Sequence, residues 1–329
     1  MKTNRISVVI PTYSPDLKML NQTLNSLTKQ SIRPEKVVVV ENGVANIKTQ
    51  EVVTSFGFNY IYEERMGANA ARNVGASVCD DGVLFFTDDD CELKHNCLEN
   101  HLSLHAQGDF VVGGKVELKY LETKPIWFCN HFESMLAKLD WTPQDVFGYV
   151  DIDITDTSYK YLVSANLSIR LSSFNKYNGF DEDDGYCGKS LLTPNDEMML
   201  LERCRSSEEL RLIFSSECIV DHNIPQYRTT ENYMNRRFYG QGVADSKLAI
   251  KSPHLKKIEP AIDLDDYNTI ITNTLLKHTV WSGHQSNLMN ENLTGDKLID
   301  REITRVYMTC YFQYIKGIQD FLEGQVCAF

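Results

Sequence analysis

The sequence has no long apolar run, no regular cysteine spacing and no excess of positive charge. No stretch of about 18 consecutive apolar residues occurs, so no transmembrane helix is expected. The early apolar run Ile6–Ile10 is too short for the core of a secretion signal. The nine cysteines are scattered, odd in number and without C-x-x-C spacing, which argues against a disulfide framework or a zinc site. We therefore expect reduced thiols in a cytoplasmic protein, either free or peripheral to the membrane.

The charge balance is acidic. Lysine and arginine total 33 against 45 aspartates and glutamates, giving a formal net charge of −12. A chain this acidic has no general attraction for nucleic acid or for an anionic membrane. A phosphate-containing ligand would therefore need a local reversal of sign, from a helix N-terminus or from a metal held by carboxylates.

Strand and helix patterns alternate over the first 118 residues, which predicts an α/β fold with a mostly parallel central sheet and helices on both faces. The β-branched runs Ile6–Ile10 and Lys36–Val40 predict buried strands, and leucines at helical spacing between them predict a crossing helix. The other elements predicted in this part are Phe58–Tyr62, Asn69–Ala76, Val83–Thr87, Lys94–His105 and Phe110–Leu118.

The later part of the chain is less regular at first and then helical. Residues 120–160 have no clear period and are rich in aromatic residues and aspartate, which is typical of a variable binding region. The elements expected beyond them are a strand Tyr161–Ile169, a helix Asp196–Arg205, strands Leu210–Phe214 and Cys218–Val220, and helices Thr230–Ile250, Ile262–Lys277 and Lys297–Glu323. Prolines bracketing the polar stretch Lys251–Pro260 predict a boundary between an α/β domain, residues 1–250, and a helical C-terminal extension, residues 251–329.

Three carboxylates directly follow an apolar strand, in the run Phe85-Phe86-Thr87-Asp88-Asp89-Asp90. Ligands of open parallel sheets bind beyond the carboxyl ends of the strands. Side chains two residues apart in an extended segment point the same way, so Asp88 and Asp90 can share a ligand while Asp89 faces elsewhere. Such hard oxygen ligands favour Mg²⁺ or Mn²⁺. The alternative is a solvated acidic turn or a helix cap.

Four segments together resemble glycosyltransferase family 2. They are Val8–Tyr13, Val40–Gly43, Ala71–Gly75 and Asp88-x-Asp90. Downstream, Ser164–Arg170 and Asn178–Glu182 are similar to the segment that leads into the family's Gly-Phe-Asp turn. Asn195-Asp196-Glu197 stands where the family usually has Glu-Asp, and His222 where it has a strand-end histidine. The resemblance covers about Ile6 to Gly242.

The resemblance implies a Rossmann-like A-type glycosyltransferase (GT-A) fold. It also implies inverting transfer of a sugar from a nucleoside diphosphate sugar, expected to be a UDP-sugar, to a hydroxyl acceptor such as a saccharide or lipid-linked saccharide. Residues 1–118 would then form the nucleotide-sugar half and residues 119–250 the acceptor half.

The site residues are carried over by position from the same resemblance. Asp88 would contact the ribose, Asp90 and His222 would hold Mn²⁺ or Mg²⁺, with the diphosphate as the alternative partner of His222, and Asp196 would be the general base. The other expected donor-binding residues are Pro11, Thr12, Tyr13, Glu41, Arg72 and Asp89. The chemistry agrees, because a cation neutralises charge on a departing diphosphate and a carboxylate can accept the proton of the attacking hydroxyl.

Two departures from the family pattern affect these assignments. Glu41 replaces a commoner aspartate, and Asn195 replaces the usual glutamate, which leaves Glu197 as a substitute base. Asp196 also follows Thr193-Pro194, so it can be read as part of a helix cap instead.

Several alternatives stay open at the level of sequence. The arginines Arg236 and Arg237 can face a diphosphate or lie on a solvated helix face. Four aromatic residues can stack on an acceptor sugar or belong to the core; they are Trp127, Phe128, Trp141 and Tyr149. A sugar-phosphate nucleotidyltransferase is a rival function, but it would need a glycine-rich loop where this chain has Pro11–Pro15. A catalytically silent nucleotide-sugar or glycan-binding protein is the other.

Overall fold

The computed structural model describes residues 5–157, 160–182, 194–207, 209–251 and 296–324. The helix predicted at Ile262–Lys277 lies outside these residues. The chain divides into two compact units. Unit 1 comprises Met1–Lys119, Leu139–Gly188 and Asp196–Asn223, and unit 2 comprises Tyr120–Lys138, Lys189–Asn195 and Ile224–Phe329.

The N-terminal part of the sheet in unit 1 is parallel, as predicted. Its strands lie in the order β3-β2-β1-β4, and each neighbouring pair is parallel. They are β1 (Ile6–Thr12), β2 (Lys36–Asn42), β3 (Asn59–Glu63) and β4 (Val83–Phe86). Strands β1 and β4 are buried along their whole length, which explains their continuous apolar runs.

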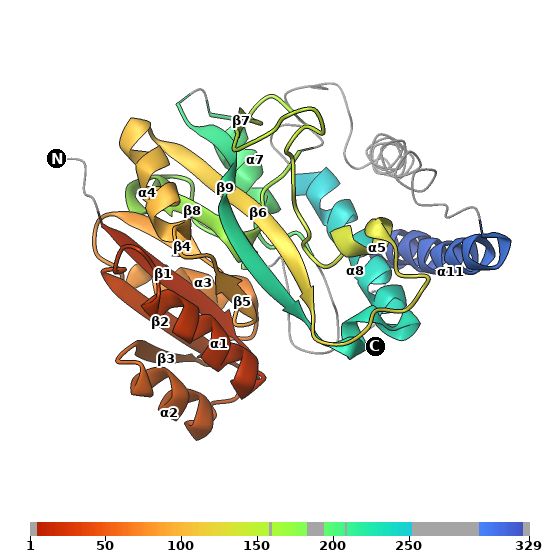
Figure 1. Cartoon of the computed structure of the whole chain (residues 1–329), viewed down its shortest axis with the longest axis horizontal. Helices are drawn as coiled ribbons and strands as arrows, with labels where there is room; N and C mark the ends of the chain where they lie inside the picture. Colours follow the sequence, from red (N-terminus) through yellow and green to blue (C-terminus); the bar gives the residue numbers. More distant parts are fainter. Residues whose placement is uncertain (1–4, 158–159, 183–193, 208, 252–295, 325–329) are drawn as a thin grey trace. The chain divides into compact units, whose positions relative to one another are not determined.

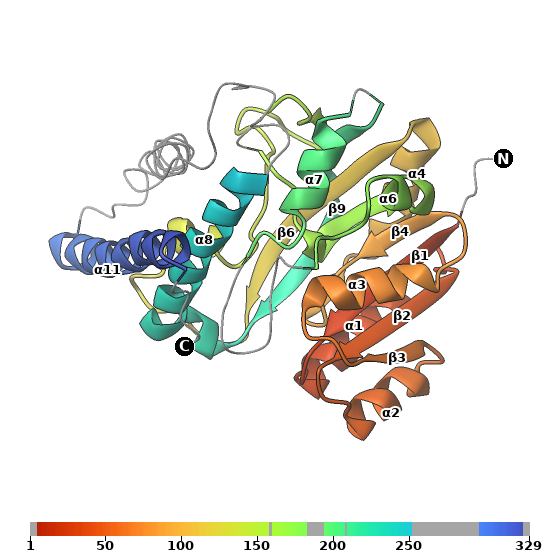
Figure 2. The ribbon, with the colours of Figure 1, turned by 180° about the vertical axis from the view of Figure 1, so that it is seen from behind.

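Helices cover both faces of this sheet. They are α1 (Leu17–Thr28), α2 (Ile47–Ser55), α3 (Ala68–Ser77) and α4 (Cys97–Gln107). Figure 1 shows α1 and α4 on the near face, and Figure 2, from behind, shows α3 on the other. A Cβ at Gly75 of α3 would lie 2.4 Å from the side chain of Val9, so this glycine lets the helix approach β1 closely. Helix α2 was not predicted, because it buries only Thr49 and Val53 and so carries no apolar stripe.

The remaining strands of the sheet pair in the antiparallel sense. Strand β8 (Leu167–Arg170) pairs with β4 and with β6 (Phe110–Tyr120). Strand β9 (Arg211–Ile224) pairs with β5 (Cys91–Leu93) and with β7 (Asp151–Asp153). The full order is β3-β2-β1-β4-β8-β6-β9-β5, with β7 on β9.

Two strand predictions in this part are wrong in extent. The strand predicted at Tyr161–Ile169 begins only at Leu167, because Ser164–Asn166 form a 3₁₀ turn, η1. The strands predicted at Leu210–Phe214 and Cys218–Val220 are one continuous strand, β9. Ser215 and Ser216 lie between the two predicted strands. Ser216 continues the structure, since its amide donates to the Val150 carbonyl and its hydroxyl accepts from the Val150 amide.

The other helices include three short ones, α5 (Asn130–Ser134), α6 (Leu171–Lys176) and α7 (Met198–Arg205), and a 3₁₀ turn η2 (Gln226–Thr229). Unit 2 contains the long helices α8 (Glu231–Lys251) and α11 (Lys297–Leu322), both as predicted. These two pack closely through glycines, since a Cβ at Gly242 would lie 2.1 Å from the Tyr314 carbonyl oxygen and one at Gly317 would lie 2.1 Å from that of Tyr239. None of the described helices has the length and apolar character needed to cross a bilayer.

Candidate active site

The acidic turn after β4 is anchored to the first strand and first helix. The Thr12 hydroxyl, at the end of β1, donates a hydrogen bond to the Asp89 carboxylate. The Thr23 hydroxyl of α1 donates to the Asp89 carbonyl at 3.0 Å. Asp89 therefore points toward β1, while its neighbours Asp88 and Asp90 meet other partners, Arg72 and His222 respectively.

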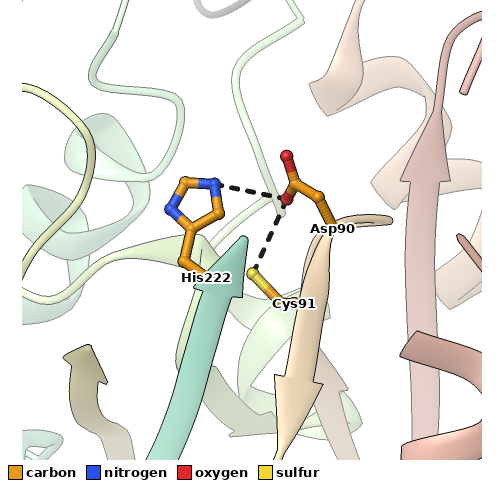
Figure 3. Close-up of side chains that lie close together, drawn as sticks. All are labelled: Asp90, Cys91 and His222. Carbon is orange, nitrogen blue, oxygen red and sulfur yellow. Dashed lines mark hydrogen bonds and ion pairs between the residues drawn. The ribbon is translucent and has the colours of Figure 1, made fainter. Parts of the chain in front are cut away.

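Asp90, Cys91 and His222 form a buried cluster (Figure 3). The ladder between β5 and β9 places Cys91 opposite His222. The His222 Nε2 atom lies 3.3 Å from Asp90 Oδ1. Asn223, the next residue of β9, secures the turn because its backbone amide donates to the Asp90 carbonyl at 2.9 Å. Backbone pairing thus holds Asp90 and His222 together, although they are 222 − 90 = 132 positions apart in the sequence.

The donor set of this cluster fits a divalent cation. A carboxylate oxygen and an imidazole nitrogen suit Mn²⁺, and their ligand atoms lie with the thiol sulfur within 4.8 Å of one another. Burial, and then the charge of Asp90, raise the pKa of the Cys91 thiol well above its ordinary value. Sequence analysis missed Cys91, although its position directly after Asp90 was the available signal.

Arg72 of α3 links the acidic turn to the segment before α7. Its guanidinium is buried and bonds Asp88 Oδ1 at 2.9 Å and Asp196 Oδ2 at 2.9 Å. Burial acts to lower the pKa of Arg72, but the charges of Asp196 and Asp88 outweigh it and the pKa is raised. The ring of Phe180 lies 5.5 Å from the guanidinium carbon. Arg72 is thus a fixed cation between two carboxylates.

Asp196 is held by two other residues of the same unit. Its Oδ2 atom meets Arg72, and its carbonyl accepts a hydrogen bond from the Asn69 side chain at 2.8 Å. Its Oδ1 atom is buried and has no hydrogen-bond partner among the described residues. Asn69 was not identified from sequence, where only its place in the small-residue start of α3 could have indicated it.

The capping interpretation of Asp196 is not supported in the described residues. Helix α7 begins at Met198, two residues later than predicted, and its N-cap is Glu197, which makes no side-chain capping bond. Glu197 is itself buried, and its Oε2 accepts from the Ser164 amide at 3.3 Å. Burial, and then the neighbouring Asp196 charge, raise the pKa of Glu197 to about 7.

Three of the residues expected to line the uridine pocket, Pro11, Thr12 and Tyr13, lie at the end of β1 or directly after it. Tyr13 lies beside the turn after β2, where a Cβ at Gly43 would come within 2.8 Å of the tyrosine ring and 2.4 Å of the Met66 sulfur. Gly43 also has φ +85, which favours glycine. Pro11 and Thr12 are buried at the end of β1.

Glu41 points into the protein. It is fully buried, and its carboxylate accepts hydrogen bonds from the Asn46 amide at 2.8 Å, the Thr49 hydroxyl at 2.9 Å and the Tyr60 hydroxyl at 2.6 Å. Burial, and then Glu41, raise the pKa of Tyr60. These bonds tie β2 to the start of α2 and to β3.

The remaining sequence candidates have contacts of their own. Trp127 and Phe128 are buried in an aromatic group with Phe132 in unit 2, which favours the core interpretation for both. Trp141 is half-buried and donates to the Tyr161 carbonyl at 2.8 Å. Tyr149 is 71% exposed. Of the two arginines, Arg237 donates to the Met135 carbonyl and Arg236 is half-buried.

Comparison with known proteins identifies the class. The chain belongs to glycosyl transferase family 2, whose model matches residues 7–177. It is 22% identical over 284 residues to the glucosyl-dolichyl phosphate glucuronosyltransferase of Haloferax volcanii, covering 84% of this chain and 85% of that protein. It is 34% identical over 124 residues to glycosyltransferase AglE of the same organism, covering 35% of this chain and 40% of that protein.

Solved structures support the fold. The crystal structure of S. aureus TarS matches 98% of this chain with a TM-score of 0.50 and 16% identity. This chain spans half of that TarS chain, and 83% of the TarS 1–349 structure, which matches with the same TM-score. The predicted GT-A-like fold is confirmed, and the family match makes the protein a glycosyltransferase, which acts on a sugar donor and an acceptor.

Proposed function

We propose that the enzyme transfers a sugar from a UDP-sugar to a hydroxyl group, with inversion at the anomeric carbon and with a divalent cation. The observation that carries this proposal is the state of Asp196. Arg72 holds one of its carboxylate oxygens, and the other is buried with no hydrogen-bond partner among the described residues. A buried acceptor of this kind favours an incoming hydroxyl as its partner, because leaving it unpaired is costly.

The donor would bind at the carboxyl ends of β1, β2 and β4. Asp90 and His222 are the proposed ligands of Mn²⁺ or Mg²⁺, with Asp88 at the ribose. A bound cation would neutralise negative charge on the departing diphosphate. It would thereby supply the local positive charge that a protein with a net charge of −12 needs in order to bind a phosphate-containing ligand. The proposed donor-binding residues are Pro11, Thr12, Tyr13, Glu41, Arg72, Asp88 and Asp89, with Glu41 acting through its support of β2 and α2.

Asp196 would act as general base. The acceptor oxygen forms a bond to the anomeric carbon as the bond from that carbon to the diphosphate oxygen breaks, and the hydroxyl proton passes to the Asp196 carboxylate. Arg72 would keep the carboxylate oriented. Proton transfer to a positioned side chain typically contributes about 10²–10⁴-fold to the rate.

A lipid-linked saccharide is the acceptor class we favour. The support comes from the relative whose name gives a glucosyl-dolichyl phosphate substrate and which aligns with most of this chain. We further propose a cytoplasmic location, free or peripheral to a membrane, consistent with seven free cysteines among the described residues. In this scheme residues 1–118 hold the donor, 119–250 face the acceptor, and 251–329 form an extension.

The first test measures UDP binding by calorimetry with and without Mn²⁺. Asp90→Asn preserves the side-chain volume and removes the charge, so we expect Mn²⁺-dependent UDP affinity to fall at least about tenfold, an effect of about 1.4 kcal/mol. The matched control is Asp221→Asn, which makes the same change from carboxylate to amide. Asp221 lies on β9 and pairs with Lys94. Unchanged affinity in Asp90→Asn would refute the metal assignment.

The second test addresses the base. A thermal-shift screen of nucleotide sugars with Mn²⁺ selects the donor, since a ligand specific for the native state raises its stability. Asp196→Asn should bind UDP and Mn²⁺ normally and lose about 10²-fold or more in UDP release from that donor. Near-normal turnover in this variant would show that another group is the base.

A further inference from the structure

Asn69, in the first turn of α3, is bonded to the proposed base by two routes. Its side-chain nitrogen donates to the Asp196 carbonyl at 2.8 Å, and its side-chain oxygen accepts from Arg72 Nη1 at 3.1 Å. The same arginine nitrogen donates to Asp196 Oδ2 at 2.9 Å. Three hydrogen bonds therefore form a closed ring through Asn69, Arg72 and Asp196. One bond of this ring holds the backbone of Asp196, and another holds its carboxylate.

The Asn69 amide also holds a second segment of the chain. Its nitrogen donates to the Asp181 carbonyl at 2.8 Å, so both amide hydrogens and the amide oxygen have partners. All these partners belong to unit 1, as does Asn69 itself. Asn69 is fully buried, so no water replaces a partner that is lost, and losing one is costly.

The partners of Asn69 explain why an asparagine stands at this position. Arg72 offers only donors and the two carbonyls only accept, so the side chain must carry both kinds of group. An aspartate would gain more from the positive end of the helix dipole, but it could not donate to either carbonyl. The amide is therefore suited to these contacts and not to the stability of α3.

We propose that Asn69 is a positioning residue for the general base. It would fix the backbone of Asp196 through the carbonyl bond and the carboxylate through Arg72, which keeps Asp196 Oδ1 available to the acceptor hydroxyl. This inference rests on the proposed role of Asp196. Asn69 would touch neither substrate, so its effect would appear in the rate of transfer and not in the binding of the donor.

Asn73 provides a matched control on the same helix, one turn later. Its side-chain oxygen accepts from the Phe180 amide at 3.0 Å, and its nitrogen donates to the Phe180 carbonyl at 2.9 Å. It thus also ties α3 to a neighbouring backbone, but among the described residues it bonds neither Arg72 nor Asp196. Asn69→Ala and Asn73→Ala remove the same side-chain atoms, and only Asn69→Ala opens the ring.

The full-length variants are assayed for UDP release from the donor that the thermal-shift screen selects. Because displacement of a reacting group by about 1 Å can cost 10²-fold, Asn69→Ala should lower kcat roughly 10- to 100-fold. Arg72 keeps its bonds to Asp88 and Asp196, so KM for the donor and UDP affinity with Mn²⁺ should stay within about threefold of the parent values. Asn73→Ala should keep kcat within about threefold of the parent.

A double variant separates positioning from a general loss of structure. If Asn69 acts only through the base, Asn69→Ala should have little further effect when it is combined with Asp196→Asn. The kcat of the double variant should then lie within about threefold of that of Asp196→Asn. A residue that supports the enzyme by another route would instead add its own roughly 10- to 100-fold loss to that of Asp196→Asn.

A further variant covers the case in which Asn69→Ala fails to fold. Asn69→Ser keeps a polar side chain that suits the start of a helix, but a hydroxyl has one hydrogen and cannot serve both carbonyls, so kcat should again fall. Hydrogen exchange, read on a peptide that covers residues 196–205, needs no substrate. Exchange should rise in Asn69→Ala and Asn69→Ser and stay at the parent level in Asn73→Ala.

The outcomes separate this inference from the proposed function. If Asp196→Asn lowers transfer while Asn69→Ala and Asn69→Ser retain full kcat and parent exchange, the positioning role is overturned and the base assignment stands. If Asn73→Ala lowers kcat as much as Asn69→Ala, or the losses add in the double variant, attachment of α3 in general is responsible and the positioning role is again overturned. If Asp196→Asn retains turnover, the base assignment itself fails and the positioning role falls with it.

Discussion

Two buried histidines on α4 predict that the protein loses stability as the pH falls from 7.5 to 5. His101 contacts the Ser168 hydroxyl at 2.8 Å and the Asn166 side-chain oxygen at 2.9 Å. His105 contacts the same hydroxyl at 2.9 Å. Burial lowers the pKa of His101 from 6.5 to about 4, and burial and then the neighbouring His101 lower that of His105 to about 3.

The magnitude follows from proton linkage. His101 binds a proton with a pKa of 6.5 in the unfolded chain but with a pKa of about 4 in the folded chain. Stability is therefore complete above pH 6.5 and falls as the pH drops toward the folded pKa. At pH 5 the loss is about 2 kcal/mol for each histidine. This value depends little on how far below 5 the folded pKa lies, and it is a large part of a typical stability of about 5–15 kcal/mol.

Urea unfolding at pH 7.5, 6 and 5 measures the effect. His101→Gln cannot take a charge but can still bond Ser168 or Asn166, so its stability should fall about 2 kcal/mol less than the parent's between pH 7.5 and 5. His95→Gln is the control, because His95 is exposed and its variant should follow the parent curve. If the His101→Gln and parent curves run parallel within about 0.5 kcal/mol, the burial argument is wrong.

Two further predictions concern other buried groups. Glu197→Gln should stabilise the protein by about 3 kcal/mol above pH 7 and have little effect near pH 4.5. The reason is that burial raises the pKa of Glu197 from 4.5 to about 7, so its ionisation opposes folding. A pH series of urea unfolding curves checks this, and a difference in stability that does not change with pH contradicts it. Gly242→Ala should destabilise by about 2 kcal/mol, because its Cβ would lie 2.1 Å from the Tyr314 carbonyl oxygen. At an open helix position the same change would stabilise by roughly 1 kcal/mol, so the sign of the shift in the urea midpoint decides the matter.

The parallel half of the sheet could be predicted because its strands are buried throughout. A strand covered on both faces needs only apolar residues, and β1 and β4 show them without interruption. The continuity of β9 could not be predicted, since the buried Ser215 and Ser216 resemble a turn in sequence and Ser216 finds its partner at Val150, on the segment entering β7. Helix α2 escaped notice because too few of its residues are buried to give a period.

The candidate site was only partly accessible from sequence. The acidic turn after β4 was evident, because charge directly following an apolar strand is a local pattern. The bridge that Arg72 makes between Asp88 and Asp196 was not, since it joins residues up to 124 positions apart and the resemblance suggested a nucleotide contact for Arg72 instead. The bond from Asn69 to the Asp196 carbonyl was equally hidden, because the two residues lie 127 positions apart.

The register of β9 limits how this chain can evolve. The strand has fourteen residues, pairs with β7 near its start, and places His222 opposite Cys91 near its end. An insertion of one residue between these points would bring Asp221 opposite Cys91 and turn His222 to the other face of the sheet. The sheet would still form, but the imidazole would leave Asp90. This strand can therefore accept substitutions on its apolar face more readily than any change in length, and related chains should vary in length in their loops instead.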